Sequence, residues 1–416
     1  MDALIAALSA FTFYYPAVMA HVWIIGSLYY YFRREHGTPG PDHAPALPYH
    51  PPVSLLVPCH NEGGQIRETI GWLLRQNYPA FEVIAIDDGS DDDTAAILNE
   101  LADCAPRLRV LRLTENRGKA MALRMGALMS AHEYLICVDG DALLDPNAVA
   151  WMMRHFIHHP RVGAVTGNPR IRNRSTLLGR IQMGEFSCII GMIKRAQRVY
   201  GRVFTVSGVV AGFRKSALQR VGYWSTDMVT EDVDVSWKLQ RDLWDIRYEP
   251  NARCWILVSE TLRGLWRQRL RWAQGGFEVL IRNLGMLRRW RERRMWLVLA
   301  EHFISVGWVY ALASLTALWL AGKLLPPHHP LQVKTFMTGP QSVVLGITTL
   351  LQFLVGFIID SRYEPKAWKY YYWIVWYPIV YWALVAAATL VGVPRALLKK
   401  RGTPATWISP DRGLRP

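Results

Sequence analysis

Residues 134–141 read YLICVDGD, an apolar run that ends in two aspartates, Asp139 and Asp141, on either side of a glycine. A short apolar run bounded by turn residues is typical of a buried β-strand. Comparable runs recur earlier in the chain, at residues 53–57, 81–86 and 108–113. Helical periodicity lies between them, at residues 66–75 and about 118–130. This alternation predicts an α/β fold, with a mostly parallel sheet and helices on both of its faces.

Three of the predicted strands end in polar clusters. These clusters are His60-Asn61-Glu62, Asp87-Asp88 and Asp139-Gly140-Asp141. Since ligands of such sheets bind beyond the carboxyl ends of the strands, the coincidence predicts a site at this edge. No GxGxxG and no GxxxxGK[ST] follows a strand, which disfavours a dinucleotide-binding Rossmann domain and a Walker-type nucleotide site.

The aspartates after the run at residues 134–138 could hold a metal ion. Asp139 and Asp141 offer the hard oxygen ligands that suit Mg²⁺ or Mn²⁺.

Two further motifs lie downstream of the predicted sheet. Asp232 precedes a predicted helix at 233–244, where an acidic residue is either a functional group or an ordinary helix cap. Gln268, Arg271 and Trp272 share one helical face, which could hold a diphosphate and stack on a sugar or could be an amphipathic surface helix.

Long apolar segments flank this block. They lie at residues 4–32, 295–321, 343–359 and 370–393. Each approaches or exceeds the roughly 20 residues that a helix needs to cross a bilayer. Arg33 and Arg34 follow the first segment, which favours a cytoplasmic continuation. The predicted organisation is a transmembrane helix at 1–34, a cytoplasmic catalytic domain at 45–262, interfacial helices at 263–294, about three transmembrane helices at 295–393 and a basic tail at 394–416.

The topology of the last segment stays open from sequence. Three spans after the catalytic domain would place the tail outside, yet the positive-inside rule prefers its basic residues inside. Those residues are Arg395, Lys399, Lys400 and Arg401. Either a late segment is re-entrant, with Pro378 marking the candidate, or the rule fails here.

Composition and charge exclude several classes of protein. The chain has 51 % hydrophobic and 19 % charged residues, five cysteines and a net charge of +15. This balance excludes intrinsic disorder, and the sparse cysteines without a CxxC pair exclude a disulfide scaffold. Ten arginines against two glutamates fall within residues 263–294. With no nucleic-acid-binding fold evident, this stretch predicts contact with anionic lipid and no nucleic-acid partner.

The ordered motifs DDGS, DGD, TED and QRLRW resemble those of processive family 2 glycosyltransferases, which have a GT-A fold flanked by membrane helices. Longer stretches are similar to the bacterial synthases of poly-β-1,6-N-acetylglucosamine. They are NRGKAMALRMGA, VDGDALLDP, VGAVTGNPRIRNRSTLLG, FTVSGVVAGFRKSAL, MVTEDVDVSWKLQ, RLRWAQGG and WISPDRG. The resemblance covers nearly the whole chain.

The resemblance implies a role for each matching residue. Asp232 would be the general base, with Glu231 beside it, and Trp272 would be the acceptor platform. Asp141 would ligate Mg²⁺ or Mn²⁺, assisted by Asp139. The UDP-sugar would be bound by Asp87, Asp88, Glu62, Arg117, Lys119, Asp139, Gln268 and Arg271.

The resemblance also implies an activity and partners. The enzyme would polymerise N-acetylglucosamine from UDP-N-acetylglucosamine, with inversion, into a β-1,6-linked biofilm exopolysaccharide and move it across the bacterial inner membrane. Implied partners are the growing polysaccharide, membrane lipid, a small membrane subunit, outer-membrane export machinery and cyclic-di-GMP as regulator. Two alternatives remain: another family 2 synthase making a chitin-like, hyaluronan or cellulose polymer, or a non-catalytic membrane scaffold.

Overall fold

The computed structural model describes residues 2–324, 340–377, 381–400 and 402–406. Its sheet has eight strands in the order β3-β2-β1-β4-β7-β6-β8-β5. The strands are β1 Val53–Cys59, β2 Phe81–Asp88, β3 Leu108–Leu113, β4 Tyr134–Val138, β5 Leu143–Leu144, β6 Val162–Ile171, β7 Val210–Arg214 and β8 Asp245–Ile256. β3, β2, β1 and β4 are parallel, whereas β7 runs antiparallel to both neighbours, so the sheet is mixed.

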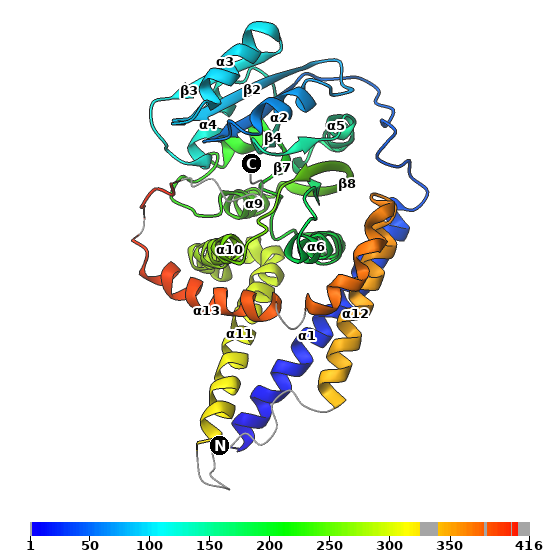
Figure 1. Ribbon diagram of the computed structural model, residues 1–416, viewed down its shortest axis with the longest axis vertical. Helices are drawn as coiled ribbons and strands as arrows, with labels where there is room; N and C mark the ends of the chain where they lie inside the picture. The colour runs from blue at the N-terminus through cyan, green and yellow to red at the C-terminus, as the bar shows by residue number, and fades with distance from the viewer. Residues whose placement is uncertain (1, 325–339, 378–380, 401, 407–416) are drawn as a thin grey trace.

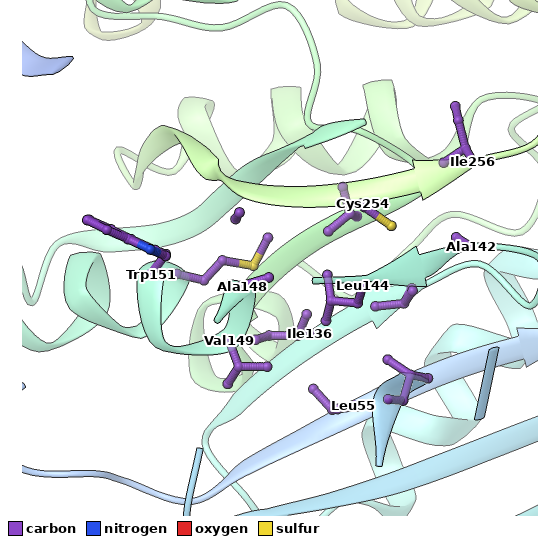
Figure 2. Packing of buried hydrophobic residues seen from close by; sticks show 14 of the residues in the cluster. Leu55, Ile136, Ala142, Leu144, Ala148, Val149, Trp151, Cys254 and Ile256 are labelled. Atoms are coloured by element: carbon purple, nitrogen blue, oxygen red, sulfur yellow. The ribbon is translucent and has the colours of Figure 1, made fainter. Parts of the chain in front are cut away.

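Helices cover both faces of the sheet (Figure 1). In the first half of the domain they are α2 Ile66–Leu73, α3 Thr94–Cys104, α4 Lys119–Met129 and α5 Ala148–His158. Successive side chains of a strand point to opposite faces, so Leu55 and Leu56 of β1 belong to two different buried clusters. Figure 2 shows part of the first cluster, in which Ile136 lies beside Val149 of α5 and Trp151 of the same helix lies farther out on the left.

The second half of the domain carries the helices that approach the membrane region. These are α6 Leu177–Gly184, the π-helix η2 Glu185–Ile190, α7 Gly191–Tyr200, α8 Lys215–Arg220, α9 Glu231–Arg241 and α10 Leu262–Asn283. The 3₁₀ helices η3 Leu284–Arg288 and η4 Trp290–Met295 follow. The arginine-rich stretch predicted at 263–294 is therefore one long helix and two short turns.

Three helical segments among the described residues are long and apolar enough to cross a bilayer. They comprise α1 Asp2–Tyr30 with the π-helix η1 Tyr31–Glu35, α11 Trp296–Gly322 and α12 Pro340–Asp360. Figure 1 shows these three extending together away from the sheet domain. They make the chain membrane-associated.

The last predicted span differs from the expected single helix. The described residues of this region form the 3₁₀ helix η5 Pro365–Trp376 and the helix α13 Trp382–Leu398, which has 17 residues. α13 packs along α10 and crosses the direction of the long helices (Figure 1). Within 295–393 the described residues thus hold two helices of spanning length where about three were predicted. Pro378 and the WISPDRG motif lie outside the described residues.

The described residues of the basic tail contact the catalytic domain. Ala405 N donates to the backbone oxygen of Thr226 at 2.9 Å. Lys399 Nζ lies 3.0 Å from Glu278 Oε2 of α10. The described part of the tail, residues 394–400 and 402–406, therefore packs against the catalytic domain and α10.

A buried ionic network joins two membrane helices to the catalytic domain. Arg195 Nε lies 2.7 Å from Glu35 Oε1, and Arg195 Nη1 lies 3.2 Å from Asp360 Oδ1. Arg170 Nη1 lies 2.8 Å from Asp360 Oδ2. All four side chains are at most 2 % exposed. The ends of α1 and α12 are therefore fixed to α7 and β6 by charges that have almost no contact with water.

Candidate active site

Asp88, at the end of β2, organises the loop that precedes α4. Its Oδ1 accepts from Arg117 N at 2.9 Å, and its Oδ2 accepts from Gly118 N at 2.8 Å. Burial raises the pKa of Asp88, while these amide donors lower it. Both carboxylate oxygens thus fix the backbone of residues 116–118. The Arg117 side chain itself is 57 % exposed and pairs with Glu115 at 2.8 Å.

His60 joins the loop after β1 to the end of β2 and to the loop after β3, and Asp87 fixes the turn that follows β2. His60 Nδ1 lies 2.9 Å from the backbone oxygen of Asp88, and Asn116 Nδ2 lies 3.0 Å from His60 Nε2. Asp87 Oδ1 accepts from Ser90 N at 3.0 Å. The predicted meeting of polar strand ends at one edge is therefore present in the structure.

Glu62 lies at the same edge, beside the turn between the two aspartates after β4. It is fully buried, and its Cγ would be 3.2 Å from a Cβ placed on Gly140. A side chain at this turn would be tightly confined, because a Cβ on Gly140 would also lie 3.2 Å from the backbone oxygen of Pro58. The loops after β1 and β4 therefore approach each other closely.

Lys119 stands at the centre of an acidic cluster. Its Nζ lies 2.5 Å from Asp139 Oδ1 and 3.6 Å from Glu231 Oε1, and it donates to the Gly208 backbone oxygen at 2.9 Å. Burial lowers the pKa of Lys119, but the two carboxylates outweigh burial and raise it overall. Lys119 is therefore a firmly protonated cation at the start of α4.

Asp139 and Asp141 form the pair expected to hold a metal ion. Burial, followed by the charge of Asp139, raises the pKa of Asp141 to about 7. Two close carboxylates that disfavour each other's ionised form fit a divalent cation, which often uses one or two carboxylates together with substrate phosphates. Within the described residues no group of three or more histidine, cysteine or acidic side chains forms a complete metal cage.

Asp232 lies in the first turn of α9 and faces the loop before β7. Its Oδ1 accepts from Val233 N at 2.9 Å, and its Oδ2 would lie 2.9 Å from a Cβ placed on Gly208. Burial, then the neighbouring charge of Glu231, raises the pKa of Asp232 to about 6, while Lys119 and Arg271 oppose the shift. A carboxyl group titrating this close to neutrality is suited to accept a proton.

The QRLRW motif lies on α10, and its Arg271 acts on the acidic cluster. The charge of Arg271 acts on both Asp139 and Asp232. The buried Oε1 of Gln268 has no hydrogen-bond partner among the described residues. A free acceptor atom and an exposed guanidinium at this position are available to a substrate.

Arg269 was missed as a site residue by the sequence reasoning. It is 5 % exposed, its Nη2 lies 2.6 Å from Glu185 Oε2 of η2, and it also bonds to the hydroxyl of Tyr381. Its guanidinium lies 4.2 Å from the centre of the Trp272 ring. Arg269 thus fixes the orientation of Trp272. Arg269 lies within the QRLRW motif, and this position was the signal that could have identified it. The prediction used only the helical face that carries Gln268, Arg271 and Trp272, and Arg269 is not on that face.

Position 118 requires a glycine because of both its backbone conformation and its surroundings. Its φ is +88°, and a Cβ there would collide with the backbone oxygen of Ala405. We expect Gly118→Ala to lower the free energy of unfolding by about 1–3 kcal/mol, the usual cost of placing an L-residue in a backbone region that is essentially restricted to glycine. It should also weaken UDP binding, because the loop held by Asp88 must shift. Thermal unfolding and UDP titration of the purified protein measure both effects.

Gly64→Ala is the matched control, because nothing lies within 4 Å of a Cβ at that position. Equal losses of UDP affinity in the two variants would contradict the role assigned to the Gly118 loop.

The mixed sheet, the acidic cluster at its edge and the apolar helices define a membrane-associated glycosyltransferase with a GT-A fold. Residues 50–275 match the family described as "Glycosyltransferase like family 2", and the chain belongs to this family. The predicted fold class and the predicted enzyme class are therefore confirmed.

Curated relatives align with almost the whole chain. The poly-beta-1,6-N-acetyl-D-glucosamine synthase of Staphylococcus epidermidis (strain RP62A) is 42 % identical over 407 residues, covering 97 % of this chain and 98 % of that protein. The protein of the same name from Staphylococcus aureus (strain MSSA476) is 43 % identical over 411 residues, with the same coverage. The predicted resemblance to this group of synthases is confirmed.

A solved structure supports the fold independently. A mannosyltransferase from Pyrobaculum calidifontis, in complex with GDP-Man and Mn²⁺, has a TM-score of 0.61 and 22 % identity. The match covers 94 % of this chain and 99 % of that chain. At this level of identity the likeness concerns the fold alone.

Proposed function

We propose that this chain polymerises N-acetylglucosamine from UDP-N-acetylglucosamine into a β-1,6-linked polysaccharide. The observation that carries the proposal is the near full-length similarity to synthases named for this product. The intact cluster of Lys119, Asp139, Glu231 and Asp232 supports an active enzyme and counts against a non-catalytic scaffold.

In the proposed mechanism Asp232 accepts the proton of the acceptor hydroxyl as its oxygen attacks the anomeric carbon. Direct displacement inverts that carbon, so an α-linked donor gives a β-linked product. Lys119, Arg271 and Gln268 bind the diphosphate and stabilise the negative charge that develops on departing UDP. Asp87, Asp88 and Glu62 shape the nucleoside side of the site, together with the Arg117 backbone.

The metal-binding residues in this proposal are Asp141 and Asp139. The structural neighbour that shares the fold is a complex with Mn²⁺. A bound Mg²⁺ or Mn²⁺ would supply positive charge at the donor diphosphate. Lys119, which already pairs with Asp139, would remain beside this charge and orient the phosphates.

Trp272 is the proposed platform for the terminal sugar of the growing chain. Its half-buried ring packs at 6.5 Å from the Phe186 ring and is covered by Arg269. A ring held on one face by a guanidinium can present only its remaining surface to a sugar. This arrangement supports a fixed position for the acceptor sugar on Trp272.

We place the enzyme in the bacterial inner membrane, with the catalytic domain cytoplasmic and the polymer moving outward. The apolar helices and the tail on the catalytic side support this topology. The arginine-rich turns η3 and η4, with Trp290 69 % exposed, support contact with anionic lipid. A small membrane subunit, outer-membrane export machinery and cyclic-di-GMP regulation stay predictions.

The donor sugar is tested by incubating membranes that contain the full chain with single radiolabelled UDP-sugars. Polymer is expected from UDP-N-acetylglucosamine alone, and linkage determination is expected to give β-1,6 bonds. Polymer from UDP-glucose alone would favour a cellulose-type product, and a β-1,4-linked N-acetylglucosamine polymer would favour a chitin-like one. A requirement for UDP-glucuronic acid as second donor would favour hyaluronan.

The pH dependence of kcat offers a test of the base. Since Asp232 has a pKa of about 6, it gains a proton as the pH falls through this value, and kcat should decline there. Glu231→Gln removes a negative charge that raises this pKa, so the acidic limb should move to lower pH. Initial rates at saturating donor, measured from pH 4.5 to about 8, check the shift. An unmoved limb in Glu231→Gln, matching the exposed control Glu100→Gln, would contradict the assignment.

A further inference from the structure

Lys194, on α7, is a buried cation that lacks a counter-ion. It is 5 % exposed, and among the described residues its Nζ makes one hydrogen bond, to Thr166 Oγ1 at 3.1 Å, and lies 5.8 Å from the centre of the Tyr248 ring. Among the described residues it has no carboxylate within ion-pair distance. Its neighbour Arg195 and the other buried lysine of the site, Lys119, each have two. Lys194 is therefore an exception among the buried cations near this site.

The surroundings of Lys194 lead to Asp232. Thr166 Oγ1, its hydrogen-bond partner, also accepts from Ser207 N at 2.8 Å. Ser207 precedes Gly208, the residue that faces the Asp232 carboxylate. Asp232 is also the charged group whose field acts on Lys194, opposing the effect of burial, which lowers the lysine pKa to about 8. Lys194 thus lies beside the loop that faces the proposed base, since Lys194 and Ser207 share the hydroxyl of Thr166.

The helix that carries Lys194 lies between the sheet and the membrane region. α7 packs along α1, and Ala196 of α7 fills the space beside Gly26 of α1. Lys119, by contrast, is the first residue of α4. It follows residues 116–118, which Asp88 holds in place and which we call the donor loop. Asp232 is therefore approached by one lysine from the donor loop and by another from the membrane-side helix.

A buried ammonium has three hydrogen-bond donors, and leaving them unpaired is energetically costly. One neutral hydroxyl accounts for a single donor of Lys194. We propose that Lys194 binds the acceptor, donating hydrogen bonds to hydroxyl or acetamido oxygens of the terminal sugar that Asp232 deprotonates. This inference rests on the proposed function. It makes Lys194 an acceptor-binding residue and leaves donor binding to the Lys119 side.

The test measures acceptor and donor binding separately on the purified full chain in detergent. The acceptor probe is a β-1,6-linked N-acetylglucosamine pentasaccharide, and the donor-side probe is UDP. Lys194→Met should weaken pentasaccharide binding about 10- to 100-fold, as expected for hydrogen bonds from a charged group. Its affinity for UDP should stay within about twofold, since the donor loop is untouched.

Lys215→Met is the matched control, because Lys215 bonds one neutral backbone oxygen, that of Ser130, away from the acidic cluster. It should leave both affinities unchanged. If Lys194→Met does not fold, Lys194→Gln keeps a hydrogen-bond donor and should show a smaller loss confined to the pentasaccharide.

Two outcomes overturn the inference. One is unchanged pentasaccharide binding in a folded Lys194 variant. The other is an equal loss of both affinities, which would indicate that Lys194 only supports Thr166 and the Ser207 loop. If the unaltered protein makes no polymer from UDP-N-acetylglucosamine, the proposed function itself fails, and this result is separate from the behaviour of the Lys194 variants.

Discussion

Asp232→Asn should reduce kcat for polymer formation about 10²- to 10⁴-fold, the usual contribution of a positioned general base. The amide cannot accept the proton of the acceptor hydroxyl at neutral pH. It keeps the size of the side chain and an oxygen that can accept from Val233 N, so the first turn of α9 should persist. Two measurements on the same preparation check this prediction. The initial rate of sugar incorporation reports on the chemical step, and the affinity for UDP reports on donor binding.

Asp242→Asn is the control for this variant, because Asp242 lies at the other end of the same helix and pairs with Arg220. It should retain near-normal activity. A folded Asp232→Asn protein that polymerises at the normal rate would remove Asp232 from the mechanism, whatever its UDP affinity.

Arg195→Met should destabilise the junction between membrane helices and catalytic domain by about 3–5 kcal/mol, the usual effect of removing one partner from a buried ion pair. Glu35 and Asp360 would then remain buried, and Glu35 would keep only the hydroxyl of Tyr363, at 2.7 Å. Thermal unfolding of the detergent-purified protein measures the loss.

Arg67→Met is the comparison for the Arg195 variant. Arg67 also forms an ion pair, with Glu100, but both side chains are more than half exposed, and such pairs contribute little. The unfolding temperature should therefore hardly change. Equal shifts in the two variants would indicate that the network around Arg195 is not what fixes α1 and α12 to the domain.

The strands and the edge of the sheet that carries the site were predictable because they depend on local patterns. Apolar runs that end in polar clusters identified β1, β2 and β4, and their parallel arrangement brought Asp88 and Asp139 to one edge. The direction of β7 was not predictable, since a five-residue buried strand carries no signal for its orientation. The mixed character of the sheet therefore emerged only from the structure.

The partners of the charged residues could not be read from sequence. Lys119 was selected through a motif, yet its pairing with Asp139 and Glu231 depends on how the start of α4 meets the loop after β4 and the start of α9. Arg269 lay inside a recognised motif, but its role depends on Glu185 of a distant π-helix. Helical spacing predicts which residues share a face and not what that face will touch.

The contact between Gly118 and Ala405 has a consequence for the timing of biosynthesis. The donor loop is made early, but the backbone that packs against it emerges about 290 residues later, after two membrane helices. At roughly 5–20 residues per second, that interval lasts about 15–60 s on the ribosome. During this time the catalytic domain can fold while its donor loop lacks the packing of the finished enzyme. A nascent chain would thus acquire full donor affinity only when its membrane helices are complete, so that polymer synthesis would begin after membrane insertion.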